Sequence, residues 1–242
     1  MRDLVVLLRP WQWSKNLIVF AGLVFSLNLS HADYVIRSVA AFALFCLASS
    51  AIYVLNDLFD RERDREHPEK RTRPIASGRV SPLVATVLGL GLIAVSMGVG
   101  ARIGPLFLGV LAAFFGLNTA YSLRLKNVVL LDVLTVAGSF VLRAVAGVAA
   151  LRPLDGTLEL SPWLLVCTMF LALFLALGKR RHELTLLESG AASHRPSLGD
   201  YSAAFLDQLI TIVSAGTLIA YAIYPIAPGT VAKFHSTWIL LT

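Results

Sequence analysis

The segment NDLFDRERDREHPEKRTRPIASG, residues 56–78, decides how this chain is interpreted. It follows an apolar run, and a helix continuing out of that run would carry Asn56, Asp57, Asp60 and Asp64 within an arc of about 100°. Three carboxylates and an amide on one helical stripe are the hard oxygen ligands that Mg²⁺ prefers. The segment therefore predicts a magnesium site at the end of a helix that leaves a membrane.

Cations follow these acids in the sequence. Lys70, Arg71 and Arg73 come shortly after Asp64, and Arg79 comes next. Guanidinium and ammonium groups bind phosphate oxygens, so the whole segment predicts a site for a metal ion and a diphosphate. The alternative is a solvated helix end in which the RERDRE run forms i,i+4 ion pairs. Carboxylates at a membrane boundary argue against that alternative, because they are costly near lipid.

The composition is that of an integral membrane protein. The 242 residues are 57% hydrophobic and only 15% charged, against about 25% charged in ordinary soluble domains. This size suits one helical bundle, so we expect residues 1–242 to form a single transmembrane domain. Cys46 and Cys167 both lie in apolar segments, and no disulfide framework is indicated.

Apolar runs predict an all-α, polytopic bundle with seven spans and the start of an eighth. The expected spans are residues 17–29, 34–55, 82–100, 104–121, 128–150, 161–178 and 203–224, and the eighth would begin at residues 231–241. A turn at residues 102–105 separates the third and fourth spans. The last run is shorter than the roughly 20 residues that a span needs, so we expect the chain to be truncated at its C-terminus.

Positive charge is distributed unevenly between alternate loops. Most of the 21 Lys and Arg residues fall in the N-terminal segment and in every second loop after it. The positive-inside rule then places the N-terminus and these loops in the cytoplasm, with the protein in the inner cell membrane. The net charge of +6 is read as a record of this topology, and nucleic acid is not an expected partner.

Two ionisable residues of the fifth span are functional candidates. Asp132 lies in an apolar run just after the polar loop that contains Lys126, and Arg143 lies eleven residues further on. Charged groups at membrane depth commonly mark substrate pathways. Asp132 could bind metal, while Lys126 and Arg143 could bind phosphate. The alternative for Arg143 is a structural pair with an acid elsewhere.

Two further basic clusters face the same side. Lys179 opens the run KRRHE after the sixth span, and Lys15 lies in the N-terminal RPWQWSKN. Both are candidate phosphate contacts. The alternatives are a topology signal or a contact with anionic lipid headgroups for the first cluster, and an interfacial aromatic anchor for the second.

Several enzyme classes have no motif here. The sequence contains no Walker loop, GxSxG, HExxH or paired CxxC, so nucleotide hydrolysis, serine hydrolysis and zinc chemistry are unsupported. Transport remains an alternative. It would be expected to place charges in the middle of several spans, whereas here the charge gathers at one face.

The motif Asn56-Asp57-x-x-Asp60-x-x-x-Asp64 resembles the first acidic motif of the UbiA superfamily of intramembrane prenyltransferases. Other stretches look like one branch of it, the decaprenyl-phosphate phosphoribosyltransferases of actinobacterial arabinan synthesis. These stretches are RPWQWSKN, HPEKRTRPIASG, YSLRLK followed by Asp132 and Arg143, and LALGKRRHEL. The resemblance covers essentially the whole chain.

Two departures from the superfamily pattern qualify what the resemblance implies. The usual second motif is Asp-x-x-x-Asp, but Val136 stands where the second acid after Asp132 would be. This departure disfavours an ordinary prenyl-diphosphate substrate and is similar to the phosphoribosyl branch. The family fold also has nine helices, more than this chain provides.

The resemblance implies Mg²⁺-dependent transfer of 5-phosphoribose from 5-phosphoribosyl 1-diphosphate to a polyprenyl (decaprenyl) phosphate, releasing diphosphate in cell-wall arabinan precursor synthesis. The implied metal ligands and catalytic residues are Asp57, Asp60 and Asp64. The implied substrate-binding residues are Lys15, Asn56, Lys70, Arg71, Arg73, Tyr121, Lys126, Asp132, Arg143 and Lys179. Two alternatives stay open: a UbiA-type prenyltransferase acting on an aromatic acceptor, and a non-catalytic transporter or lipid-binding protein.

Overall fold

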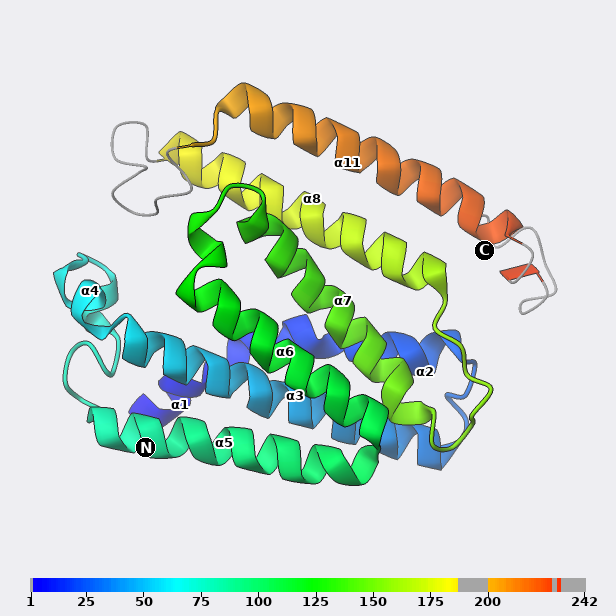
Figure 1. The fold of residues 1–242 in the computed structure, drawn as a ribbon, viewed down its shortest axis with the longest axis horizontal. Helices are drawn as coiled ribbons and strands as arrows, with labels where there is room; N and C mark the ends of the chain where they lie inside the picture. The colour runs from blue at the N-terminus through cyan, green and yellow to red at the C-terminus, as the bar shows by residue number, and fades with distance from the viewer. Residues whose placement is uncertain (1, 187–199, 228–229, 232–242) are drawn as a thin grey trace. The chain divides into compact units, whose positions relative to one another are not determined.

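The structure is a computed structural model that describes residues 2–186, 200–227 and 230–231. Within these ranges every regular element is a helix (Figure 1). In chain order the elements are α1 (Arg2–Leu8), η1 (Pro10–Phe20), α2 (Ala21–Phe25), α3 (Ala32–Phe59), α4 (Arg61–Glu66), η2 (Lys70–Thr72), α5 (Pro82–Ile103), α6 (Pro105–Leu123), η3 (Leu125–Asn127), α7 (Leu131–Leu151), α8 (Pro162–Leu186), α11 (Ala203–Ile223) and η4 (Tyr224–Ile226).

Six helices of the described chain are long and apolar enough to cross a membrane, namely α3, α5, α6, α7, α8 and α11. They correspond to the second to seventh expected spans, so the prediction of an all-α, multi-pass membrane protein is confirmed. The expected turn between the third and fourth spans is also present, because α5 ends at Ile103 and α6 begins at Pro105. The expected eighth segment lies outside the described residues from position 232 onward.

The first expected span, residues 17–29, differs from the prediction of a regular α-helix. The chain forms the 3₁₀ helix η1 and then the short helix α2. A 3₁₀ helix has three residues per turn, which places Trp13, Asn16 and Val19 on one face. Trp13 donates a 3.0 Å hydrogen bond to Ser50 of α3, and Asn16 and Val19 are fully buried. The three-residue period of η1 thus gives the helix one face, with polar and apolar side chains, that packs on α3.

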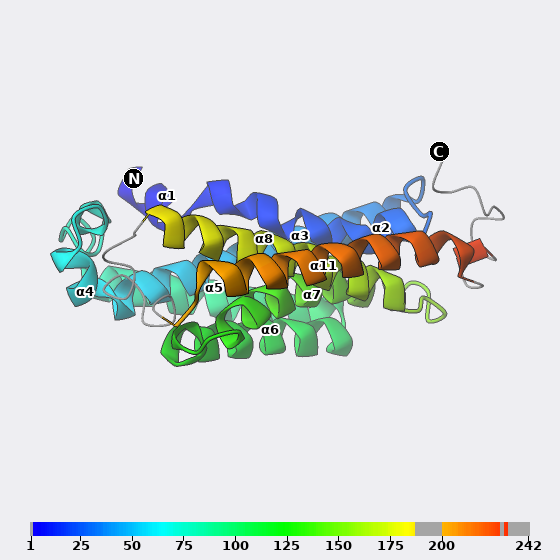
Figure 2. The ribbon, with the colours of Figure 1, turned by 90° about the horizontal axis from the view of Figure 1, so that it is seen from above.

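The chain divides into two compact units. The first comprises Met1–Ser122 and Leu142–Glu159, and the second comprises Leu123–Val141 and Leu160–Thr242. In the first unit α3 packs along α5, and in the second α8 packs along α11, as Figures 1 and 2 show. Helix α7 contributes its first half to the second unit and its second half to the first.

The first unit has two apolar cores. The larger contains Phe45, Phe107 and Phe114, all at most 1% exposed. Their ring centroids lie 6.0 Å (Phe45 to Phe107) and 5.0 Å (Phe45 to Phe114) apart, distances typical of favourable aromatic pairs. Van der Waals contacts between such close-packed side chains stabilise helix packing within a membrane.

The smaller core of the first unit lies beneath the charged loop. It joins Leu7 of α1, Val54 of α3, Ile75 and Val80 of the loop, and Ala85 of α5. Residues from position 7 to position 85 therefore meet on the same apolar cluster. This packing fixes the loop relative to the end of α3, where the acidic residues lie.

Two glycines allow the N-terminal segment to approach α7 closely. A Cβ added to Gly147 would lie 2.0 Å from the carbonyl oxygen of Val19, and one added to Gly22 would lie 2.6 Å from the carbonyl carbon of Gly147. No side chain fits at either position. Backbone contact of this kind between small residues is common in membrane helix packing.

The second unit has its own core, in which α7, α8 and α11 meet. Its buried members are Val133, Leu177, Tyr201, Leu206 and Val213. Ser202 begins α11 by accepting a hydrogen bond from the backbone N–H of Phe205, a usual helix N-cap.

Arg37 ties two helix ends of the first unit together. Its guanidinium donates hydrogen bonds to the carbonyl oxygens of Ile103 (3.0 Å), at the end of α5, and Ala150 (3.3 Å), near the end of α7. Cations stabilise helix C-termini because they satisfy unpaired carbonyls and oppose the helix dipole. Arg37, in the N-terminal part of α3, therefore has a structural role.

Candidate metal and phosphate site

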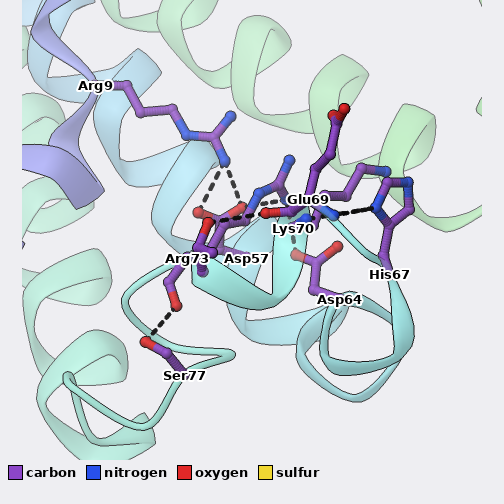
Figure 3. Close-up of polar contacts among 9 residues, drawn as sticks. Arg9, Asp57, Asp64, His67, Glu69, Lys70, Arg73 and Ser77 are labelled. Carbon is purple, nitrogen blue, oxygen red and sulfur yellow. Dashed lines mark hydrogen bonds and ion pairs between the residues drawn. The ribbon is translucent and has the colours of Figure 1, made fainter.

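Two of the three predicted acids converge on one arginine. The Nη1 atom of Arg73 donates to Oδ1 of Asp57 at 2.9 Å and to Oδ2 of Asp64 at 2.7 Å (Figure 3). Both carboxylate side chains are only 4% exposed. Because they share a donor atom, the two oxygens are separated by no more than these distances combined, about 5.6 Å.

A second arginine, from the N-terminal segment, contacts one of these two acids. Arg9 Nη2 donates to both oxygens of Asp57, at 2.6 and 2.8 Å, and its guanidinium carbon lies 5.0 Å from the centre of the Tyr53 ring. Figure 3 shows Arg9 and Arg73 approaching Asp57 from different elements. Charge-assisted pairs of this type are among the stronger hydrogen bonds in proteins.

Asp60 lies at a break between helices. The backbone of Asp60 (φ −88°, ψ 6°) ends α3 and precedes α4, so the single continuous helix expected for the acidic stripe is interrupted there. Asp has a low helix propensity, which suits this position. The break still leaves Asp57 and Asp64 facing the same guanidinium.

The donor chemistry of this cluster fits Mg²⁺ in part. Among the described residues no group of three or more His, Cys, Asp or Glu side chains is gathered closely enough to hold a metal ion. Mg²⁺ in proteins is commonly bound by one or two carboxylates, with water and substrate phosphates completing its shell. The Asp57 and Asp64 oxygens already surround one cation, the Arg73 guanidinium, and are suitable ligands of this kind.

Burial opposes ionisation of Asp64. It raises the pKa of that carboxyl above its ordinary value, and the nearby charge of Asp57 acts in the same direction, while the Arg73 guanidinium lowers it. Cations beside Asp64 therefore favour its charged form. A divalent ion in the position of Arg73 would do the same more strongly.

The loop that carries Arg73 is held by many internal hydrogen bonds. His67 Nδ1 accepts from the backbone N–H of Glu69 at 3.2 Å, and Ser77 Oγ donates to the carbonyl of Arg73 at 2.8 Å (Figure 3). Arg65 Nε donates to the carbonyl of Ala76 at 3.1 Å. These hydrogen bonds give the loop a defined conformation and fix the backbone of Arg73.

The other residues of this segment have different surroundings. Lys70 is half-buried, whereas Arg71 is exposed. Asn56 accepts a 2.6 Å hydrogen bond from Ser122 Oγ and so joins the ends of α3 and α6. Tyr121, the neighbour of Ser122, is half-buried, and Lys15 is exposed on η1.

Arg143 lies deep in the first unit. It is 6% exposed, its Nε donates to Oδ1 of Asn16 at 2.7 Å, and its guanidinium carbon lies 4.7 Å from the centre of the Phe114 ring. Asn16 also accepts from Ser49 at 3.2 Å. The cation thus contacts an amide oxygen and an aromatic face, which can stabilise a buried guanidinium.

Asp132 belongs to a separate buried network in the second unit. Its Oδ2 accepts from Arg180 Nε at 2.8 Å and its Oδ1 accepts from the Tyr201 hydroxyl at 2.7 Å. Arg180 also donates to Glu183 at 2.6 Å, and the Tyr201 hydroxyl accepts from the N–H of Leu130 at 2.8 Å. Burial, and then the bond to Asp132, raise the pKa of Tyr201.

The structure brings only some of the predicted site residues into contact with one another. Asp57, Asp64 and Arg73 meet directly, and Lys70 lies close enough for its charge to lower the pKa of Asp64. The first unit holds Lys15, Asn56, Asp60, Lys70, Arg71, Tyr121 and Arg143 as well, and the second holds Lys126, Asp132 and Lys179. Lys126 is half-buried and Lys179 is exposed, 3.7 Å from Glu183.

Sequence reasoning did not assign Arg9, Asn16 or Arg180 to a site. Arg9 and Asn16 belong to the quoted stretch RPWQWSKN, and Arg180 follows Lys179. Their partners are 48, 127 and 48 residues away in sequence, respectively. Local spacing gives no sign of such pairs.

The helices and this charged cluster define a multi-pass membrane protein with a candidate site for a cation and a phosphorylated ligand. A profile of the UbiA prenyltransferase family matches residues 17–241. The chain belongs to this family.

Relatives agree with that assignment, and a solved structure shares the fold. The chain is 36% identical to the decaprenyl-phosphate phosphoribosyltransferase of Mycolicibacterium smegmatis, covering 91% of this chain and 69% of the relative. It is 37% identical to that of Corynebacterium glutamicum, covering 95% and 68%. The structure of a UbiA homologue from Archaeoglobus fulgidus bound to GPP and Mg²⁺ matches with a TM-score of 0.76 at 19% identity, covering 99% of this chain and 83% of that one. The resemblance inferred from the sequence motifs is confirmed.

Proposed function

We propose that this chain transfers 5-phosphoribose from 5-phosphoribosyl 1-diphosphate to a polyprenyl (decaprenyl) phosphate and releases diphosphate, as a step in cell-wall arabinan precursor synthesis. The observation that carries the proposal is 36–37% identity, over more than 90% of the chain, to enzymes named for this activity. The cluster of Asp57, Asp64, Arg9 and Arg73 supplies the charged groups that such a donor requires.

In this proposal Asp57, Asp60 and Asp64 hold Mg²⁺, which neutralises the leaving diphosphate. The relevant carboxylates are preformed, since Asp57 and Asp64 already face one cation. Solved UbiA homologues bound to Mg²⁺ and prenyl diphosphates support a divalent cofactor for the fold. Cations near the acids then bind the phosphates, with Lys70, Arg71 and Arg73 assigned to the donor.

Bond breaking at the ribose leaves positive character on the sugar, as in glycosyl transfer generally. The acceptor phosphate is an anion at neutral pH, so it attacks without a general base. The catalytic work of the protein is then to position the two substrates and stabilise charge. This division suits a site built from carboxylates and cations.

The remaining predicted residues take supporting roles in the proposal. Lys15, Lys126, Arg143 and Lys179 bind phosphate, and Asn56, Tyr121 and Asp132 position substrate. The chain acts as a single transmembrane domain in the inner membrane, with its N-terminus and site loops in the cytoplasm. The soluble donor is cytosolic and the lipid acceptor is in the membrane, so a site at the cytoplasmic face reaches both.

The proposal is tested by comparing acidic variants in isolated membranes supplied with Mg²⁺, decaprenyl phosphate and ribose-labelled donor. Asp57→Asn and Asp60→Asn should each reduce label in the organic phase by at least about a hundredfold, because each removes a charge that stabilises the leaving group. Asp33→Asn is the matched control, since Asp33 is exposed in the first turn of the same helix, α3. Full transfer by Asp60→Asn at normal protein levels would contradict the metal assignment.

A further inference from the structure

Arg9 is held in place by contacts on both sides. Its backbone is in the left-handed region (φ 52°, ψ 58°), an uncommon conformation for a residue with a side chain. The preceding Leu7 is fully buried, and Ser50 donates a 2.8 Å hydrogen bond to the carbonyl of Leu8. Trp13, on the other side, donates to the same Ser50. The chain therefore directs the Arg9 side chain toward the end of α3.

The four side chains joined by the ion pairs at Asp57 and Asp64 carry balanced charges without any ligand. Asp57 and Asp64 carry two negative charges, and Arg9 and Arg73 carry two positive charges. The carboxylates are 4% exposed, whereas the Arg9 and Arg73 side chains are 21% and 30% exposed. The arginines thus cover the carboxylates, and a cation that binds Asp57 from solvent must displace at least one of them.

From this arrangement we infer that Arg9 is an exchangeable counter-ion: it neutralises Asp57 until a divalent cation binds, and then turns to a phosphate group of the bound diphosphate. The inference deepens the proposed function and rests on it for the identity of the anion. A divalent ion added to a balanced cluster leaves two excess positive charges at short range. Release of Arg9 from Asp57 relieves that repulsion, and a diphosphate supplies the anion that the released guanidinium requires.

Arg9 is suited to this exchange more than Arg73. Arg9 contacts one carboxylate, that of Asp57. Its guanidinium carbon also lies 5.0 Å from the centre of the Tyr53 ring, and this cation–π contact can stabilise part of the guanidinium charge after Arg9 leaves Asp57. Arg73 bridges two carboxylates and lies in a hydrogen-bonded loop. Release of Arg9 breaks contacts to one acid only.

The exchange predicts that the cation and the anion bind cooperatively. Without diphosphate, Arg9 competes with the metal for Asp57 and weakens metal binding. With diphosphate, Arg9 has a new partner and the competition disappears. By linkage the diphosphate strengthens metal binding by the same factor as the metal strengthens diphosphate binding. Couplings between sites are typically about 5–150-fold.

The experiment measures Mn²⁺ binding to the purified full chain in detergent by electron paramagnetic resonance, with and without pyrophosphate. Arg9→Gln should bind Mn²⁺ about tenfold more tightly than wild type in the absence of pyrophosphate. Pyrophosphate should also strengthen Mn²⁺ binding by Arg9→Gln much less than it strengthens Mn²⁺ binding by the wild type. Complexation of Mn²⁺ by pyrophosphate in solution is identical for all variants and cancels in the comparison. Arg9→Lys keeps the charge but not the bidentate contact with Asp57, and its Mn²⁺ affinity should lie between those of the wild type and Arg9→Gln.

The matched control is Arg102→Gln, which removes an exposed arginine in the last turn of α5. It should bind Mn²⁺ as the wild type does. Equal or weaker Mn²⁺ binding by a folded Arg9→Gln, with the pyrophosphate effect unchanged, would overturn the inference and leave Arg9 as a tie for the N-terminal segment. Arg9→Lys provides the same test if Arg9→Gln does not fold.

Failure of the proposed function gives a different result. If phosphoribose is not transferred but the Mn²⁺ pattern is as described, the inference about Arg9 stands and the proposed reaction falls. If Asp57→Asn leaves Mn²⁺ binding unchanged, the carboxylates are not the metal site and both the metal assignment and the inference are wrong.

Discussion

Replacement of Arg180 by methionine should destabilise the second unit strongly. Asp132 is fully buried and Arg180 is 4% exposed, and their ion pair of 2.8 Å is therefore shielded from water. Methionine retains an unbranched apolar side chain but removes the guanidinium whose Nε donates to Asp132. Breaking one side of a buried ion pair typically costs about 3–5 kcal/mol, because an uncompensated charge stays buried.

The double variant Asp132→Asn/Arg180→Met should recover most of this loss. The asparagine carries no charge and can still accept the Tyr201 hydrogen bond. Replacement of both members of a buried pair is often close to neutral, so we expect the double variant to lie within about 1–2 kcal/mol of wild type. The difference from additivity measures the coupling of the pair.

The assay is the free energy of unfolding in mixed micelles, followed by circular dichroism as denaturing detergent is added. Arg181→Met is a control, since Arg181 pairs with Asp207 at a partly exposed position and should cost less than about 1 kcal/mol. A loss below 1 kcal/mol for Arg180→Met, or additive effects of the two single changes, would refute the reasoning. Transfer by the stable double variant would also separate a structural role of Asp132 from the substrate contact proposed for it.

Two further predictions concern the packing of the first unit. Gly147→Ala should lower the free energy of unfolding by at least about 1–3 kcal/mol, because its Cβ would lie 2.0 Å from a backbone oxygen. The control Gly98→Ala, with open space around the added Cβ, should change stability little. Equal effects of the two substitutions in an unfolding titration would contradict the close approach of the backbones. Asn16→Ala removes the acceptor of Arg143 Nε and should cost about 1.5–3 kcal/mol. The control in the same titration is Asn28→Ala, which loses only a 3.1 Å hydrogen bond to the carbonyl of Ser26. If Asn16→Ala lowered the free energy of unfolding no more than Asn28→Ala does, the result would argue against the Arg143 contact.

The spans were predictable because they depend on local composition. Apolar runs of sufficient length predicted six of the helices that are suited to cross a membrane. For residues 17–29 the apolar run predicted a span but not its local geometry, since apolar content does not distinguish a 3₁₀ helix from an α-helix. The distinction lies in the period of three that buries Asn16 and Val19 against α3, and this period depends on a partner that the local sequence does not reveal.

The acids were predictable from their spacing, but their counter-ions were not. Asp57 and Asp64 are seven residues apart and meet because the chain stays nearly helical through Asp60. The pairing of Arg9 with Asp57 spans 48 residues and depends on the packing of α1 and η1 on α3. Long-range contacts of this type follow from tertiary structure and cannot be read from local patterns.

Asp132 was singled out because charged residues at membrane depth are rare. That reasoning found a residue with an important contact but could not tell a structural partner from a ligand. The Asp132–Arg180 ion pair in the second unit is buried, so the loss of one partner alone is costly. The predicted substrate contact of Asp132 stays a prediction.

The central proposal is tested most directly with a doubly labelled donor, carrying one label in the ribose and another in the β-phosphate of the diphosphate. Membranes containing the chain, Mg²⁺ and decaprenyl phosphate are extracted with organic solvent. We predict that the ribose label enters the organic phase while the diphosphate label stays in water. Chelation of the metal should keep the ribose label in water as well. Ribose label confined to the aqueous phase, while a polyprenyl diphosphate and an aromatic acid yield a prenylated product in a parallel reaction, would contradict phosphoribosyl transfer.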